Sequence, residues 1–322
     1  GMGGAFTALG DEATGAWYNP AGIVDVGGAS IGLTVSAYQL DVRRLSSQFS
    51  LGDKTADLAT RDFASFPSSF GYVRSFGTTL PQALAVTIVV PDYESYAGSV
   101  SIVGATSDAG GGVVRNVDLA ASFRRSDRTI WFGLGYALRP HKRIALGANV
   151  AYALRHFQLG VSGHVQGTRM DELLVGETGA ARAELLHGSL SMDFGLKLTL
   201  ADNFFFGVAV RTPNLRTNRS GSVLFGDATG QLAQWSGADI EVESNEPLRV
   251  SVGLAYAKPR SFTLAADVRI HAPVSPYEPV LRRQADGTII PDPIAGATLA
   301  RTTVVNISVG GEYYLSERFL LR

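Results

Sequence analysis

Apolar side chains alternate with small or polar side chains along most of this chain, and this two-residue period constrains its fold more than any other feature. In residues 143–157, RIALGANVAYALRHF, every second residue from Ile144 to Leu154 is apolar, and the positions between them carry glycine, alanine, asparagine or arginine. The same alternation occurs in residues 188–199, 248–256, 262–271 and 304–315. Successive strand residues point to opposite faces of a sheet, so the pattern predicts β-strands with one apolar face. We therefore expect an all-β fold.

Short connections and long loops alternate between the expected strands. Short polar connections near residues 79, 141, 202, 259 and 317 recur every 57 to 62 residues. Between them we expect long loops at residues 96–115, 168–180, 225–245 and 273–301. A soluble β-sandwich also alternates, but short turns at one end and long loops at the other are typical of outer-membrane barrels. The layout favours a transmembrane, antiparallel, up-and-down β-barrel in the bacterial outer membrane, with its apolar face toward lipid.

The strand count indicates a barrel that lacks its last strands. We expect ten strands, with an eleventh beginning at Phe319, at residues 29–42, 63–77, 81–97, 116–139, 142–166, 180–200, 203–224, 238–258, 260–272 and 302–315. Single-chain bacterial barrels have an even number of strands and no open edge. No charged and apolar leader opens the chain, so we also expect a processed or trimmed product.

Composition argues against several function classes. The net charge is −1, from 28 basic and 29 acidic residues, which gives no electrostatic footprint for nucleic acid. Cysteine is absent and the five histidines are scattered, so we expect no metal site and no cofactor. We find no phosphate-binding loop and no serine–histidine motif, and therefore expect no enzyme activity. No uninterrupted apolar run reaches the roughly 18 residues of a membrane-spanning helix.

The first 23 residues, GMGGAFTALGDEATGAWYNPAGI, are too rich in glycine for a helix and too irregular for a strand. The lumen of a large barrel is wider than its own side chains can fill. Glycines allow close backbone approach, and aromatic residues supply packing. We therefore predict that residues 1–28 form a hatch that plugs a barrel of residues 29–322; a disordered leader is the alternative. The expected hatch contacts are Phe6, Trp17, Tyr18, Asn19 and Pro20.

This opening segment resembles the N-terminal hatch of the FadL-type outer-membrane long-chain fatty acid transporter family. In that family a glycine-rich GAF stretch, an acidic and alanine-rich patch and an NPAG motif precede the first strand. The stretches FPSSFGYVRSFG, VVPDYES, FGLGYALR, VAVRTPNL, LRVSVGLAYAKP and VGGEYYLSERFLLR are also similar to the family. The resemblance implies a monomeric barrel of about 14 strands among outer-membrane lipids, plugged by the hatch.

The resemblance also implies a function. Family members take a hydrophobic molecule such as a long-chain fatty acid from outside, hold it in the lumen and release it sideways where the third strand kinks. A related branch with the same opening serves as a secretion-system scaffold or shuttle that binds a protein partner. The residues leave both functions open for this chain.

Two sets of residues are candidates for the transport path. Pro91 has no N–H for the strand ladder, so Pro91 and Asp92 are predicted to mark a lateral gap; alternatively, Pro91 ends regular pairing above the membrane. The predicted carboxylate-binding residues of the lumen are Arg155, Arg211, Arg249, Arg269 and Lys197. Guanidinium groups bind carboxylates bidentately, and among these residues we favour Arg155 and Arg211. Pairing of these charges with Asp193, Asp267 and Glu312 is the alternative.

Overall fold

The computed structural model describes residues 3–51, 53–108, 113–169, 172–226, 232–236, 240–277, 280–283, 289–291, 299–315 and 320–321. Nearly all of this part is antiparallel β-structure, as the sequence predicted. None of the helices in these ranges has the length and apolar character needed to cross a membrane.

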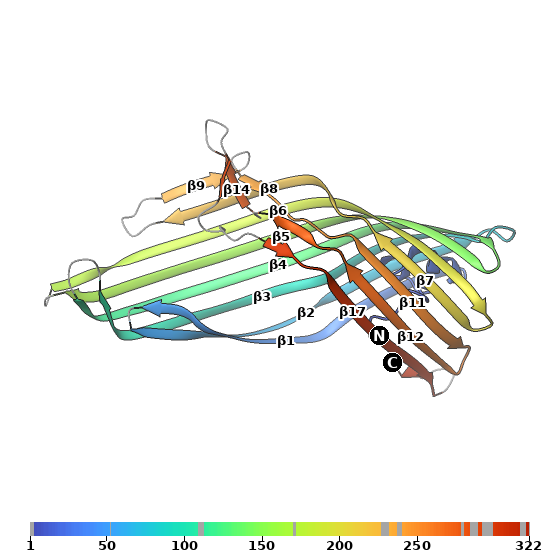
Figure 1. Ribbon diagram of the computed structural model, residues 1–322, viewed down its shortest axis with the longest axis horizontal. Coiled ribbons are helices and arrows are strands. Elements are labelled where there is room, and N and C mark those ends of the chain that lie inside the picture. The colour runs from blue at the N-terminus through green and yellow to red at the C-terminus, as the bar shows by residue number, and fades with distance from the viewer. Residues whose placement is uncertain are drawn as a thin grey trace.

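One sheet of 13 strands forms the body of the molecule (Figure 1). Its main path runs through β1 (Ala29–Leu51), β2 (Lys54–Phe76), β3 (Gln82–Asp108), β4 (Val113–His141), β5 (Ile144–Arg169), β6 (Glu172–Ala201), β7 (Phe204–Arg211), β11 (Arg249–Lys258), β12 (Phe262–His271), β17 (Val304–Tyr314) and β18 (Leu320–Leu321). Two further strands, β8 (Leu215–Gly226) and β9 (Leu232–Ser236), extend the sheet from the upper part of β6. Among the described residues, β1 and β18 are the ends of the path and do not pair with each other.

The strands differ greatly in length. β1 to β6 have 23 to 30 residues each, whereas β7, β11, β12 and β17 have 8 to 11. Figure 1 shows that β1 to β6 project far beyond the shorter strands at the end opposite the short turns. The loops predicted at residues 96–115 and 168–180 are therefore mostly wrong, because these residues continue as β-hairpins. Residues 43–62, between the first two predicted strands, also form a hairpin.

Two predicted strands are interrupted. The strand expected at 203–224 breaks at residues 212–214, where Pro213 has no N–H for the ladder; β6 pairs with β7 before the break and with β8 after it. The strand expected at 238–258 begins only at Arg249. The residues before it include β10 (Ile240–Val242), which belongs to a small sheet with β14 (Val280–Arg283) and β15 (Ile289–Pro291). Another small sheet joins β13 (Val274–Tyr277) to β16 (Leu299–Arg301).

The apolar face of the sheet points away from the interior, as predicted. Leu146, Phe194 and Val252 are 43%, 49% and 37% exposed and do not meet in a common core. The short turns near residues 79, 141, 202 and 259 are present, and the turn expected near 317 lies outside the described residues. A band of exposed apolar side chains thus surrounds the shorter part of the sheet, as membrane insertion requires.

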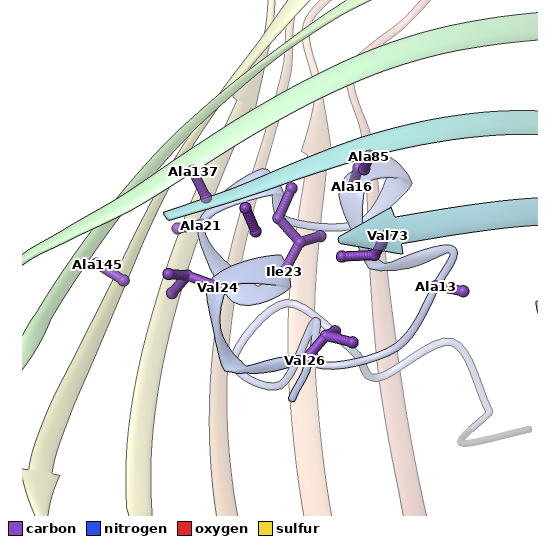
Figure 2. Close-up of a cluster of buried hydrophobic side chains, with 11 residues drawn as sticks. Ala13, Ala16, Ala21, Ile23, Val24, Val26, Val73, Ala85, Ala137 and Ala145 are labelled. Carbon is purple, nitrogen blue, oxygen red and sulfur yellow. The ribbon is translucent and has the colours of Figure 1, made fainter. Parts of the chain in front are cut away.

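The N-terminal segment, which we define as residues 3–28, lies inside the curve of the sheet. It contains two short 3-10 helices, η1 (Gly15–Trp17) and η2 (Pro20–Asp25). In Figure 2, Ile23 and Val24 from η2 lie among Val73, Ala85 and Ala137 from the surrounding strands. Small side chains on the strands leave room for this segment, which forms the main buried core of the interior.

Candidate functional site

Glycines on the inner face of the sheet let the backbone of the N-terminal segment approach closely. A Cβ atom at Gly195 would lie 2.1 Å from Asn19 Oδ1, and one at Gly207 would lie 2.1 Å from the carbonyl oxygen of Thr7. Gly147, which pairs with Gly195, would place its Cβ 2.4 Å from the backbone nitrogen of Ala21. Any side chain at these positions would collide with the segment, so glycine is needed there.

Asp267 of β12 holds the start of the segment. Its Oδ2 atom accepts hydrogen bonds from the Phe6 and Thr7 backbone N–H groups at 2.8 and 2.9 Å, and from the Thr7 hydroxyl at 2.7 Å. The carboxylate is 2% exposed. A buried carboxylate with three donors on one oxygen is a strong local anchor.

Asn19 and Pro20 fix the middle of the segment. The Asn19 amide donates to the carbonyl oxygens of Thr7 and Leu196 at 2.7 and 3.0 Å, and its Oδ1 atom accepts from the Ala21 N–H at 3.1 Å. Asn19 thereby caps η2, and Pro20 stands at the first helical position, where its missing N–H costs nothing. The NPAG motif thus forms a capped turn that is tied to β6.

Lys197 also contacts the N-terminal segment. Its ammonium group donates to the carbonyl oxygen of Leu9 at 2.6 Å and lies 2.8 Å from Asp25 Oδ2. Asp25 forms a second ion pair with Arg139 of β4. Lys197 is 4% exposed, so the geometry gives this predicted ligand-binding residue a contact with the segment and little access for a ligand.

One amide and three charged side chains lie in one row across the inner wall. Asn149, Asp193, Arg211 and Arg249 are register partners on β5, β6, β7 and β11. Arg211 donates to both carboxylate oxygens of Asp193, at 2.5 and 3.0 Å, and the Asn149 amide donates to Asp193 Oδ2 at 2.9 Å. We call these four residues the charged row. Both oxygens of its carboxylate are occupied by Arg211.

Two tryptophans stack against the charged row. The Arg211 guanidinium lies 3.9 Å from the ring centre of Trp17 and 4.9 Å from that of Trp131. The two indole rings meet edge to face at 5.4 Å. Such cation–π contacts favour a desolvated arginine. Arg211 therefore connects the N-terminal segment to β4 and β7 and is almost fully buried.

The arginines of the lumen differ in how far their donors are used. Arg155 makes a bidentate pair with Asp127 at 2.9 and 2.7 Å and also donates to the Ser244 hydroxyl. In the part of the chain that the structure describes, Arg249 lies 3.6 Å from Asp193 Oδ1, 3.5 Å from the Trp17 carbonyl oxygen and 5.6 Å from the Trp17 ring centre. Within the described residues, the buried Nε of Arg269 has no hydrogen-bond partner. Among the described residues, Arg155 and Arg211 thus use their donors in bidentate carboxylate pairs, whereas Arg249 and Arg269 have weaker or missing contacts.

An apolar inner wall stands above the charged row, toward the long-strand end. Leu185 of β6 packs against Val223 of β8 and Val242 of β10, and Phe157 and Leu159 of β5 border this cluster. These positions have the same strand parity as the charged row, so they face the lumen. The lumen therefore changes from apolar above to basic below.

The sheet is disrupted at Pro91. Between the pairs Val89–Trp131 and Asp92–Thr129, two residues of β3 face one residue of β4, which is the pattern of a β-bulge. On its other side, β3 pairs with β2 only as far as Val89, opposite Ser69. Pro91 itself is exposed, and the side chain of Asp92 lies outside the part that the structure describes.

The tip of the β1–β2 hairpin meets β3 again above this break. The Thr106 N–H donates to Asp53 Oδ1 at 2.7 Å, and Lys54 donates to the Val103 carbonyl oxygen at 2.6 Å. The Thr106 hydrogen bond lowers the pKa of Asp53 from its ordinary value, so this carboxylate stays ionised. Among the described residues, β2 and β3 are thus not paired between Val89 of β3 and the contact of the hairpin tip at Val103 and Thr106.

Phe6, Trp17 and Tyr18, predicted from their aromatic character, pack within the N-terminal segment or on the wall. The Phe6 and Tyr18 rings are 5.4 Å apart. From the sequence, Asp193 and Asp267 were predicted only as charge partners, and the glycines on the inner face of the sheet were not predicted to contact the N-terminal segment. A usable signal was present, because Gly147, Gly195 and other glycines recur on the non-apolar face of the alternating segments.

Comparison with known proteins places this geometry in a known fold. No protein-family model and no curated protein matches the sequence. The solved toluene transporters TodX of Pseudomonas putida (14% identity, TM-score 0.57) and TbuX of Ralstonia pickettii (17%, 0.61) cover 100% and 99% of this chain, over 82% of each of their own. A Pseudomonas aeruginosa FadL homologue (14%, 0.64) covers 99% of this chain over 76% of its own. These likenesses show the FadL-type barrel fold that the sequence predicted.

Proposed function

We propose that this protein is a FadL-type channel of the bacterial outer membrane that carries hydrophobic small molecules bearing an acidic group. The observation that carries the proposal is the change within the lumen, from the apolar wall around Leu185 to the basic end of the charged row at Arg249. A long-chain fatty acid has an apolar chain that would contact the apolar wall and a carboxylate that would contact the basic end. The proteins of similar fold named above are described as toluene transporters or as a FadL homologue, and none as an enzyme.

We further propose that residues 3–28 plug the lumen and that the ligand leaves sideways near Pro91. The end of β2–β3 pairing at Val89 and the bulge at Pro91 support this exit, because an unpaired stretch of wall leaves space between neighbouring strands. Release into the bilayer suits an apolar ligand, which gains free energy by staying out of water.

Replacing Arg249 by glutamine should weaken the binding of a long-chain fatty acid by about tenfold or more, because one charge-assisted hydrogen bond to the carboxylate is lost. Binding of the corresponding primary alcohol should not change. Titration of the purified protein with both compounds, by displacement of a fluorescent fatty acid, would measure the two affinities.

Arg155→Gln is the matched control, since the Arg155 guanidinium already donates hydrogen bonds to Asp127 and Ser244. It should leave fatty acid affinity within about twofold of the parent protein. Equal fatty acid affinity of the parent protein and the Arg249→Gln variant would contradict the assignment of Arg249. Failure of the parent protein to bind either compound would favour the scaffold function instead.

Replacing Pro91 by valine should reduce uptake into proteoliposomes several-fold, because valine restores an N–H group and favours regular pairing of β3. Pro81→Val is the control, as Pro81 lies in the short turn before the same strand. Uptake of a fluorescent fatty acid would be compared at equal amounts of folded protein. Unchanged uptake in the Pro91→Val variant would remove the lateral exit from the proposal.

A further inference from the structure

The outer face of the long strands carries a basic groove that the transport path does not use. Arg124 of β4 and Arg182 of β6 are both register partners of Gly160 on β5, so they flank it on the same face of the sheet. Three adjacent strands put the two arginine Cα atoms about 10 Å apart. Both arginines are exposed, and a Cβ at Gly160 would meet no atom within 4 Å. The space over Gly160 is therefore open.

The lining of this groove combines polar side chains with apolar residues such as Ala97, Val161 and Ala181. The groove has a volume of about 730 Å³, and its walls include Gln158, Ser122 and Ser162 in addition to the two arginines. The two serine hydroxyls are 2.6 Å apart. A second hollow of about 570 Å³ shares both serines and continues along the strands. Hydroxyl and amide groups next to guanidinium groups suit a ligand that carries both hydroxyls and anionic oxygens.

One carboxylate lies near the groove and is already engaged. Glu184 accepts hydrogen bonds from His156 at 3.1 Å and Gln158 at 3.2 Å, and Arg182 lies 3.6 Å from its other oxygen. The hydrogen bonds from His156 and Gln158 lower the pKa of Glu184, so it is ionised at neutral pH. Glu184 offsets part of the charge of Arg182, whereas Arg124 is two strands away from Glu184.

The groove lies on the face that meets lipid lower down. On β4, the outward side chains run from Tyr136 through Leu134, Phe132 and Ile130 before the first charged one, Arg128. Arg124 is six residues beyond Ile130, or about 20 Å along the strand and about 15 Å along the membrane normal at the usual tilt. Phospholipid headgroups add only about 5 to 8 Å to each side of the hydrocarbon core. The groove therefore lies farther from the hydrocarbon core than phospholipid headgroups reach, at a distance that only a larger lipid headgroup would span.

We propose that this groove binds the phosphorylated sugar headgroup of an outer-leaflet glycolipid. Arg124 and Arg182 pair with phosphate oxygens, and Ser122, Ser162 and Gln158 hydrogen-bond sugar hydroxyls. Arg128 continues the same basic face down to the edge of the apolar band. The inference rests on the proposed outer-membrane orientation, in which the long strands point outward. It concerns the outside of the barrel and is independent of any ligand in the lumen.

Binding of lipopolysaccharide with a phosphorylated core would test the groove, measured on the purified full chain in phosphatidylcholine nanodiscs. The double variant Arg124→Gln/Arg182→Gln should bind it at least about tenfold more weakly than the parent protein. Glu184→Gln should bind it more tightly, because a competing carboxylate is removed. The double variant Lys142→Gln/Arg143→Gln loses the same charge at the short-turn end and should bind like the parent protein.

Chemically dephosphorylated lipopolysaccharide should bind weakly, with no difference between the parent protein and the groove variant. Equal loss of binding in both double variants, or equal binding of both lipids, would overturn the proposal. Displacement of the phosphorylated lipid by millimolar inorganic phosphate alone would overturn the assignment to a glycolipid headgroup. Fatty acid uptake by the groove variant is measured in parallel, so loss of lipid binding with normal uptake separates this proposal from that of the channel.

Discussion

Replacement of Asp267 by alanine is expected to release the N-terminal segment from the wall. The Phe6 and Thr7 N–H groups and the Thr7 hydroxyl would lose their common acceptor in a buried place. Loss of these charge-assisted bonds should cost about 3 to 5 kcal/mol in the free energy of docking of the segment. Limited proteolysis of the folded barrel would measure this, and cleavage within residues 3–28 should be at least about 100-fold faster.

Asp202→Ala is the matched control, because Asp202 is exposed in the short turn between β6 and β7. It removes the same charge without touching the segment and should leave the cleavage rate unchanged. If the Asp267→Ala variant were as resistant to protease as this control, Asp267 would not be the anchor described here.

Gly195→Val should displace the same segment by collision. The new Cβ would lie 2.1 Å from Asn19 Oδ1 and 2.8 Å from the Ala21 backbone nitrogen, and β6 and the capped turn cannot both stay in place. We expect the free energy of docking of the segment to become less favourable by more than about 3 kcal/mol, which exceeds the usual penalty for overpacking. The expected result is a protein with an intact barrel, seen by circular dichroism, whose Trp17 has left its contact with Arg211 and emits differently.

Gly160→Val tests whether valine in a long strand is harmful by itself. Gly160 faces open space, so this variant should melt at the same temperature as the parent protein or slightly higher. Tryptophan emission that stays the same in both variants would show that the close approach at Gly195 does not hold the segment.

The sequence allowed the membrane part of the barrel to be predicted well, and its outer part poorly. Leu146, Phe194 and Val252 were assignable to lipid because lipid demands one apolar face, and the contrast between the two faces is large there. Beyond the membrane the contrast between the faces is weaker, since the outward Ser122, Arg124 and Ser126 alternate with Phe123, Arg125 and Asp127. The strands continue there by backbone pairing and small apolar clusters such as Ile102, Ala105 and Val117, which the alternation did not reveal, so residues 96–115 were predicted as a loop.

The candidate site was predicted in its residue types and not in its pairings. Alternation places Arg155, Arg211 and Arg249 on the lumen face, but it does not give the register between strands. Register decides that Arg211 faces Asp193, and that Arg155 meets Asp127 from the preceding strand. The long contacts of Arg249 follow from these pairings and are therefore a property of the folded sheet.

The contact between Thr7 and Asp267 joins residues 260 positions apart. Loop closure over such a distance is slow, and contacts of this kind form late. Residues 3–28 are therefore among the last parts of the protein to reach their final neighbours. The N-terminal segment cannot complete its contacts until β12 has joined the sheet. Curving of the sheet and docking of the segment are therefore coupled steps of folding.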